Sequence, residues 1–193
     1  MADIKTIAVI GAGPLGREIA HAAALGGFRI ALEDILPASL RRAHSEIRDS
    51  LHRGVELGEL SPQQANNTLA RIEFAGSIDE AARAAELVIE AVPDELESKL
   101  EIFILLDKIC APATILVSST SSLSITEIAS VTYRAGRCAG MRFINPLNKM
   151  KVLEIICGAD TDHATVDACV DVGNRMGKEV VVVKDSSAFA QQR

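Results

Sequence analysis

The sequence predicts an α/β fold with a doubly wound, mostly parallel sheet, helices on both of its faces and a projecting helical hairpin. Two observations carry this prediction. Short apolar runs rich in β-branched residues recur along the chain, and most are followed by a turn signal and then by the apolar spacing of a helix. Glycines also cluster where the first run meets the first helix. Strands that alternate with helices in this way are typical of a parallel sheet covered on both faces.

The first half of the chain repeats this strand and helix rhythm. A strand is expected at Thr6–Ile10, followed by a tight turn at GAGPLG and an alanine-rich helix over 15–25. Further strands are expected at 30–33, 87–91 and 114–117, where apolar runs end in turn signals.

Two helices are expected between the second and third of these strands. One is a long amphipathic helix over 38–55. The other begins after Ser61, which is followed by Pro62 at the first helical position and by Gln64, so that a capping box is expected. Together they predict the projecting hairpin.

The last third of the chain is richer in strands. Apolar runs predict strands at 152–156 and 180–183, with one helix over 163–176 between them. Residues 185–189 have the pattern of a further helix start. Because no linker, repeat or change of composition divides the chain, 1–193 is expected to form a single domain.

Composition narrows the class of protein. The 193 residues are 48% hydrophobic, which is enough for one substantial core. The net charge of -6 argues against a nucleic-acid partner, because such proteins concentrate Lys and Arg on one face. No apolar run approaches the roughly 20 residues that a membrane span needs, so no membrane contact and a cytoplasmic location are expected. The four cysteines have neither CxxC nor metal-ligand spacing, which favours buried thiols and implies no metal site.

The glycine turn is the most informative motif. A bare GxGxxG pattern is weak evidence, but here it follows a strand and opens a helix. In that setting the first glycine makes the tight turn, the second lets the backbone approach a pyrophosphate, and the third lets the helix pack closely on the strand. The residues expected to hold a dinucleotide are Gly11, Gly13, Pro14, Leu15 and Gly16.

An acidic pair follows the turn at the expected distance. Glu33 and Asp34 end the second strand, where the adenosine ribose hydroxyls should lie. A carboxylate there repels a 2'-phosphate, so the cofactor is expected to be NAD instead of NADP. Arg41 and Arg42 come later and lie within a helix, which predicts a solvated face. The sequence therefore predicts a Rossmann-type NAD-binding domain with Asp34 on the ribose.

Five motifs, taken in order, resemble the 3-hydroxyacyl-CoA dehydrogenase family. They read AVIGAGPLG, LVIEAVPDELESK, SSTSSLSI, GMRFINPLNKMKVLEII and VVVKDSSAFAQQR, and they cover the whole chain. The resemblance implies the family's N-terminal NAD-binding domain, in an oxidoreductase of fatty acid metabolism that acts on a 3-hydroxyacyl-CoA or a related 3-hydroxy acid. The family's helical C-terminal domain, which completes the substrate site and forms the dimer, is expected to be absent. Self-association or pairing through the surface it would cover is therefore expected.

The resemblance also implies roles for single residues. It places Asp94 and Lys99 near the cofactor, although Lys99 alone reads equally well as a solvated helix charge. It places Ser121 and Asn145 near the nicotinamide and the substrate, as both cofactor-binding and catalytic residues. Ser50, on the helical hairpin, matches a contact to coenzyme A.

The family's catalytic pair departs from its pattern in this chain. In the family, a histidine paired with a glutamate takes the proton of the 3-hydroxyl group as hydride leaves for the nicotinamide. The glutamate here is Glu154, but the histidine position is Arg142. A guanidinium stays protonated at neutral pH and cannot act as a base. Arg142 is expected to pair with Glu154 instead, which predicts a disabled catalytic pair.

Three interpretations stay open at this stage. The first, favoured as the family assignment, is an NAD-dependent 3-hydroxyacyl-CoA dehydrogenase without its helical domain. In the second, the oxidoreductase has another substrate, whose carboxylate or carbonyl oxygen Arg142 binds. The third is a catalytically silent NAD-binding or interaction module. The glycine turn and Asp34 favour cofactor binding in all three.

Overall fold

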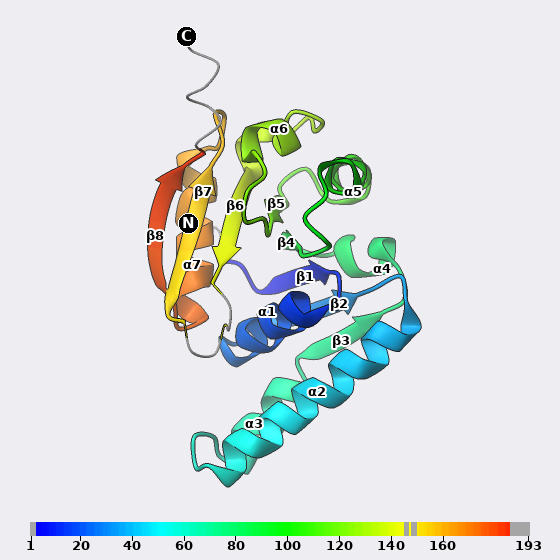
Figure 1. Cartoon of the computed structure of the whole chain (residues 1–193), viewed down its shortest axis with the longest axis vertical. Coiled ribbons are helices and arrows are strands. Elements are labelled where there is room, and N and C mark those ends of the chain that lie inside the picture. Colours follow the sequence, from blue (N-terminus) through cyan, green and yellow to red (C-terminus); the bar gives the residue numbers. More distant parts are fainter. Residues whose placement is uncertain (1–2, 145–146, 148–149, 186–193) are drawn as a thin grey trace.

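The structure, a computed structural model, describes residues 3–144, 147 and 150–185. These residues form an eight-stranded sheet with helices on both faces (Figure 1). The strands are β1 (Thr6–Ile10), β2 (Arg29–Glu33), β3 (Ile72–Ala75), β4 (Leu87–Glu90), β5 (Ile115–Ser118), β6 (Cys138–Phe143), β7 (Val152–Cys157) and β8 (Glu179–Lys184). The helices are α1 (Pro14–Leu25), α2 (Pro37–Glu56), α3 (Pro62–Leu69), α4 (Ile78–Ala82), α5 (Leu96–Ile109), α6 (Ile125–Ala129) and α7 (His163–Arg175), with a 3-10 turn at Ala135–Arg137.

The strand order confirms the predicted doubly wound sheet. It runs β3-β2-β1-β4-β5-β6-β7-β8, and every neighbouring pair is parallel except β6 with β7. The chain moves outward from β1 to β3, then returns to the other side of β1 with β4. In sheets of this kind ligands bind outside the carboxyl ends of the strands, at the point where the order reverses. That point lies between β1 and β4.

Two apolar cores cover the two faces of the sheet, because successive residues of a strand point to opposite faces. Ile7 and Val9 of β1 belong to the core beneath α1, α2 and α7. Ala8 and Ile10 of the same strand belong to the core beneath α4, α5 and α6. A strand buried on both faces reads as a continuous apolar run, which explains why these strands were predictable.

The predicted helical hairpin is present as α2 and α3, which extend from the rest of the molecule in Figure 1. The capping box at its second helix is also confirmed. The Ser61 hydroxyl accepts a hydrogen bond from the Gln64 amide at 3.2 Å, and the Gln64 side chain accepts one from the Ser61 amide at 2.8 Å. Two backbone donors that a helix start leaves without intrahelical partners are thereby satisfied.

Three elements of the fold were not predicted, namely β3, α4 and β6. β3 has only four residues and α4 only five, so neither is long enough to show a periodicity of its own. The further helix start expected at 185–189 lies outside the described residues, apart from Asp185. Within the described part of the chain, no helix is both long enough and apolar enough to cross a membrane.

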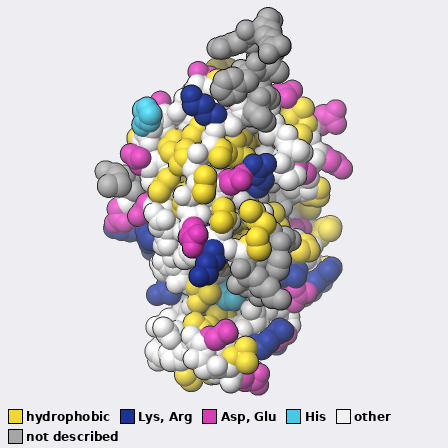
Figure 2. Space-filling view, turned by 60° about the vertical axis from the view of Figure 1, so that its left-hand side comes forward, with side chains coloured by type: hydrophobic (Ala, Val, Ile, Leu, Met, Phe, Trp, Pro, Cys, Tyr) yellow, Lys and Arg dark blue, Asp and Glu magenta, His cyan; other side chains and the backbone are white. Residues whose placement is uncertain are grey.

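β8 forms one edge of the sheet and exposes apolar side chains. Val181 and Val182 are 47% and 49% exposed. Figure 2 turns this side of the molecule forward and shows hydrophobic side chains between scattered charges of both signs. On this face, Lys and Arg are interspersed with Asp and Glu among the described residues, instead of forming a basic stripe.

Glu33, at the end of β2, predicts a pH-dependent stability. The side chain is buried, and burial together with the neighbouring charge of Asp34 raises its pKa from 4.5 to about 7. A raised folded-state pKa means that Glu33 favours folding below pH 4.5 and that this contribution is lost as the pH rises through 7. At about 1.4 kcal/mol per pKa unit, ionisation costs up to roughly 3 kcal/mol.

Glu33→Gln removes this cost, so its melting temperature is expected to exceed that of the parent by about 6–12 °C at pH 8. At pH 5 the two proteins are expected to melt at similar temperatures. Differential scanning calorimetry at both pH values measures the difference. Glu73→Gln, on the exposed side of β3, is the control and should show no such pH dependence. An equal gain at both pH values would contradict the assignment.

Candidate functional site

A cavity of about 350 Å³ opens at the reversal point of the sheet. It is lined by residues 13–15 at the start of α1, 91–94 after β4, 119–121 after β5, and 142–143 at the end of β6. Four segments far apart in the sequence therefore meet at the carboxyl ends of parallel strands, as the sheet topology requires. The predicted site residues that line this cavity are Gly13, Pro14, Leu15, Asp94, Ser121 and Arg142.

The glycine turn joins β1 to α1 in a shape that few other residues permit. Gly11 has a φ of +101°, and a Cβ built on it would lie 2.9 Å from the Ala91 carbonyl oxygen. A Cβ on Gly16 would lie 1.8 Å from the Gly11 carbonyl oxygen, so α1 packs against the turn with no room for a methyl group. These two glycines thus have structural roles.

Gly13 differs from its neighbours because the space in front of it is open. A Cβ built on Gly13 meets nothing within 4 Å, and its φ of -63° suits any residue. Gly13 is the N-cap of α1, and Pro14, which has no N–H group, takes the first helical position. The next amides of the first turn have no intrahelical acceptor, and the helix dipole favours an anion there. The open space and the donors fit a pyrophosphate group.

Asp34 is held against the glycine turn. Its Oδ2 accepts a hydrogen bond from the Ala12 amide at 2.9 Å, and its Oδ1 accepts one from the Leu36 amide at 2.8 Å. The carboxylate therefore lies at the end of β2 beside the phosphate-binding turn, where a ribose diol would meet it. Arg41 and Arg42 are both exposed on α2, as expected of a solvated face.

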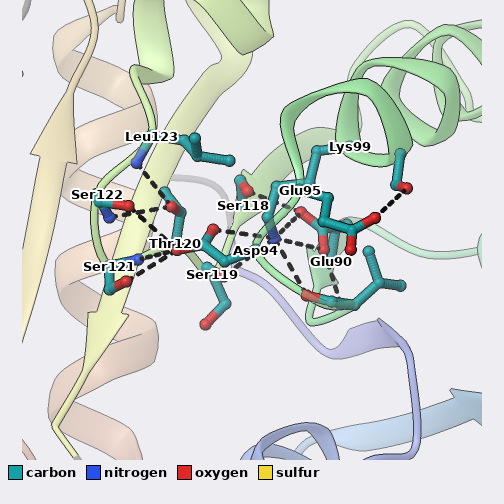
Figure 3. Close-up of polar contacts among 12 residues, drawn as sticks. Glu90, Asp94, Glu95, Lys99, Ser118, Ser119, Thr120, Ser121, Ser122 and Leu123 are labelled. Atoms are coloured by element: carbon teal, nitrogen blue, oxygen red, sulfur yellow. Dashed lines mark hydrogen bonds and ion pairs between the residues drawn. The ribbon is translucent and has the colours of Figure 1, made fainter.

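Asp94 and Ser121 form a hydrogen-bonded pair between the loops after β4 and β5 (Figure 3). The Ser121 hydroxyl and amide both donate to Asp94 Oδ2, at 2.8 and 3.1 Å. Desolvation raises the pKa of Asp94, but hydrogen bonds from Thr120 and Ser121 and the charge of Lys99 outweigh it, so that the pKa is lowered. Asp94 is therefore a carboxylate that fixes the rotamer of Ser121 at the cavity wall.

Lys99 is not the solvated helix charge that the sequence allowed. Its side chain is completely buried, and its Nζ lies 2.8 and 2.9 Å from the two carboxylate oxygens of Glu90. Burial raises the pKa of Glu90, and Lys99 opposes that shift. Neither residue lines the cavity. Sequence reasoning missed Glu90, although an acid that ends the wholly buried strand LVIE was a signal for it.

Arg142 and Glu154 form the predicted ion pair. They lie opposite each other on the antiparallel strands β6 and β7, so the sheet register brings their side chains together. Arg142 Nε donates to Glu154 Oε2 at 2.7 Å, and Nη2 contacts the same oxygen. Arg142 Nη1 also donates to the Ser121 carbonyl oxygen at 3.0 Å. The guanidinium thus bridges β7 and the loop that carries Ser121.

The predicted site residues of the described structure that do not line the cavity are Gly11, Gly16, Asp34, Ser50, Lys99 and Glu154. Ser50 lies on α2, half-buried, and does not line the cavity. Asn145 lies outside the described residues. Among the described residues, no three His, Cys, Asp or Glu side chains are grouped so that they could hold a metal ion.

Known proteins similar to this chain are named as dehydrogenases, which agrees with a cavity that fits a dinucleotide. A probable 3-hydroxybutyryl-CoA dehydrogenase of Bacillus subtilis is 39% identical over 99% of this chain and 66% of its own length. The mitochondrial hydroxyacyl-coenzyme A dehydrogenase of Homo sapiens is 34% identical over 98% of this chain and 62% of its own length. This chain thus spans 62–66% of the length of these two curated relatives.

Solved structures and a family model lead to the same family. The crystal structure of (S)-3-hydroxybutyryl-CoA dehydrogenase from Ralstonia eutropha superposes with a TM-score of 0.92 at 35% identity, and covers 95% of this chain and 65% of that chain. That of 3-hydroxybutyryl-CoA dehydrogenase from Escherichia coli K12 has a TM-score of 0.93 at 36% identity, covering 97% of this chain and 39% of that chain. Residues 6–186 match the model of the 3-hydroxyacyl-CoA dehydrogenase NAD-binding domain. The chain therefore belongs to the 3-hydroxyacyl-CoA dehydrogenase family, as its NAD-binding domain.

Proposed function

We propose that this chain is the cofactor-binding part of an oxidoreductase that transfers hydride between NAD and a 3-hydroxyacyl-CoA or a related 3-hydroxy acid. We further propose that the chain by itself binds NAD but does not catalyse turnover. One observation carries the proposal: the open N-terminus of α1, the Asp94–Ser121 pair and Arg142 all line one cavity. The substrate class rests on the names of the relatives.

The residues that would hold NAD are those that the sequence predicted. The first-turn amides of α1 would bind the pyrophosphate in front of Gly13, and Asp34 would accept hydrogen bonds from the ribose hydroxyls. Ser121, fixed by Asp94, would lie at the nicotinamide end of the cavity. When bound, NAD supplies the acceptor for hydride from the 3-hydroxyl carbon. Asn145 is proposed for the same end of the site on the family resemblance alone.

The proton of the 3-hydroxyl group also needs an acceptor when hydride leaves. Arg142 cannot be that acceptor, because its guanidinium is already protonated and donates to Glu154 and to the Ser121 carbonyl. Glu154 Oε2 in turn accepts from Arg142 Nε. This arrangement supports the absence of turnover and favours a second candidate function, an NAD-binding module without catalysis of its own. These contacts occupy three of the five N–H groups of the guanidinium, so only two are left to bind a substrate carboxylate.

The remaining substrate contacts are proposed to come from outside the part of the fold described above. The relatives extend beyond the region matched to this chain, which supports an additional substrate-binding part. Ser50 on α2 is proposed as a coenzyme A contact, again on the resemblance. The exposed valines of β8 support self-association or pairing at that edge of the sheet. Four cysteines without a disulfide support a reducing compartment such as the cytoplasm.

The test is a titration of the purified chain with NADH, followed by acetoacetyl-CoA while the nicotinamide absorbance is recorded. The parent, Arg142→His and the control Arg137→His are compared. Arg137 directly precedes β6, the strand that carries Arg142, but it lines no part of the 350 Å³ cavity. All three are expected to bind NADH in the micromolar range, since Arg142 is neutralised by Glu154.

No oxidation of NADH by the parent is expected, because reduction of the 3-keto group needs a group that gives up a proton near neutral pH, and the Arg142 guanidinium at the position of the family's histidine keeps its proton. If Arg142→His does not oxidise NADH either, the chain needs further substrate contacts for turnover. Turnover by the parent would overturn the proposed role of Arg142. Failure of the parent to bind NADH would refute the cofactor assignment itself.

A further inference from the structure

We propose that Glu90 is a positioning residue for the nicotinamide end of the cavity. Through Lys99, it holds together the loop after β4 and the loop after β5, without touching the cofactor. This inference rests on the proposed function, because it concerns how the same cavity keeps its shape.

Glu90 is completely buried, and both oxygens of its carboxylate accept hydrogen bonds. Oε1 accepts from Lys99 Nζ at 2.8 Å and from the Val92 amide at 2.7 Å. Oε2 accepts from Lys99 Nζ at 2.9 Å and from the Ser118 hydroxyl at 2.7 Å. With two donors on each oxygen, the geometry is that of an ionised carboxylate whose lone pairs are all used. A charge buried this deeply is stable only when it is paired and hydrogen-bonded, as here.

Lys99 extends this contact into both loops that line the cavity (Figure 3). Besides Glu90, its ammonium donates to the Val92 carbonyl oxygen at 3.3 Å and to the Ser119 carbonyl oxygen at 3.2 Å. Val92 belongs to the cavity segment after β4, and Ser119 to the segment after β5. One buried ammonium therefore ties the two loops to each other.

The same ammonium lies 3.9 Å from Asp94 Oδ1, and Asp94 holds the hydroxyl and amide of Ser121. A continuous set of contacts thus runs from Glu90 through Lys99 and Asp94 to Ser121. Asp34 is outside it, since its carboxylate accepts from the Ala12 and Leu36 amides. The glycine turn borders it only at the loop after β4, where a Cβ built on Gly11 would lie 2.9 Å from the Ala91 carbonyl oxygen and 3.2 Å from the Val92 nitrogen. The network therefore concerns the nicotinamide end of the cavity and not the adenosine end.

The location of Lys99 distinguishes a positioning role from direct binding. Lys99 has no exposed surface, and its ammonium faces protein oxygens. If its charge acted directly on the cofactor, removing the countercharge at Glu90 would leave NADH binding unchanged or tighter. If Glu90 and Lys99 position the two loops, the same change weakens NADH binding. The two roles thus predict opposite signs.

The experiment compares the parent, Glu90→Gln and the control Glu86→Gln by calorimetric titration with NADH and, separately, with ADP. Glu86 lies at the other end of the same strand region, is exposed, and accepts from the Lys5 and Thr6 amides. ADP carries the adenosine and pyrophosphate but no nicotinamide. For Glu90→Gln we expect the NADH dissociation constant to rise about tenfold and that of ADP to change by less than about twofold. Glu86→Gln should bind both ligands as the parent does.

The double variant Glu90→Gln/Lys99→Met guards against misfolding, because it removes both buried charges at once. It should still bind ADP normally and NADH weakly, since the two carbonyls have lost their shared donor. Unchanged or tighter NADH binding by Glu90→Gln, equal losses for NADH and ADP, or normal NADH binding by the double variant would each overturn the inference. Failure of the parent to bind either ligand would instead refute the proposed function on which it rests.

Discussion

Gly13→Val is expected to abolish NADH binding while the fold stays intact. The backbone of Gly13 has dihedral angles that a valine adopts freely, and a Cβ there meets nothing within 4 Å. The added side chain would therefore extend into the space proposed for the pyrophosphate, with no clash at its Cβ. We expect the NADH dissociation constant to rise at least about 100-fold, which corresponds to roughly 2.7 kcal/mol.

The fold is monitored by thermal unfolding of the same samples. Because an apolar residue is a poorer N-cap than glycine, a loss of up to about 1 kcal/mol is expected. For a chain of this size that lowers the melting temperature by about 2–4 °C. Tight NADH binding by a folded Gly13→Val variant would show that the pyrophosphate does not lie at the start of α1.

Gly16→Ala, in contrast to Gly13→Val, is expected to act on the fold. Its single added methyl group should cause a large loss of stability. Its Cβ would lie 1.8 Å from the Gly11 carbonyl oxygen and 2.9 Å from the Gly11 carbonyl carbon. Both obstacles are backbone atoms of the turn, so α1 has to move away from β1. Overpacking of this kind costs about 3 kcal/mol or more, and the melting temperature is expected to fall by at least about 6–12 °C.

Gly54→Ala is the matched control for that experiment. Gly54 also lies within a helix, but a Cβ there meets only the flexible Leu60 side chain, at 3.1 Å or more. Alanine is the better helix former by about 1 kcal/mol, so this variant should be as stable as the parent or slightly more stable. If Gly16→Ala melts together with Gly54→Ala, the close contact between α1 and the glycine turn is not what limits stability.

Much of the fold and of the candidate cofactor site could be predicted from the sequence alone, because the signals for both are local. Strands buried on both faces leave continuous apolar runs, as at Thr6–Ile10. The capping box at Ser61 and Gln64 needs only residues three apart. The glycine turn and Asp34 are separated by one strand and one helix, and their spacing followed a known pattern. These predictions therefore did not depend on how distant segments pack.

Only the tertiary structure decided which residues share an environment across distant segments. Lys99 reads as a surface charge along its own helix, and it is buried only because β4 and β5 place Glu90 and Ser119 around it. β3 and α4 are too short to be recognised by periodicity, and β3 forms because β2 offers an edge on which it pairs. Likewise, Gly13 and Gly16 look alike in the motif. Only the surrounding backbone shows that Gly13 faces open space, whereas Gly16 has no room for a methyl group. Such distinctions arise from packing between segments far apart in the chain, which no local pattern records.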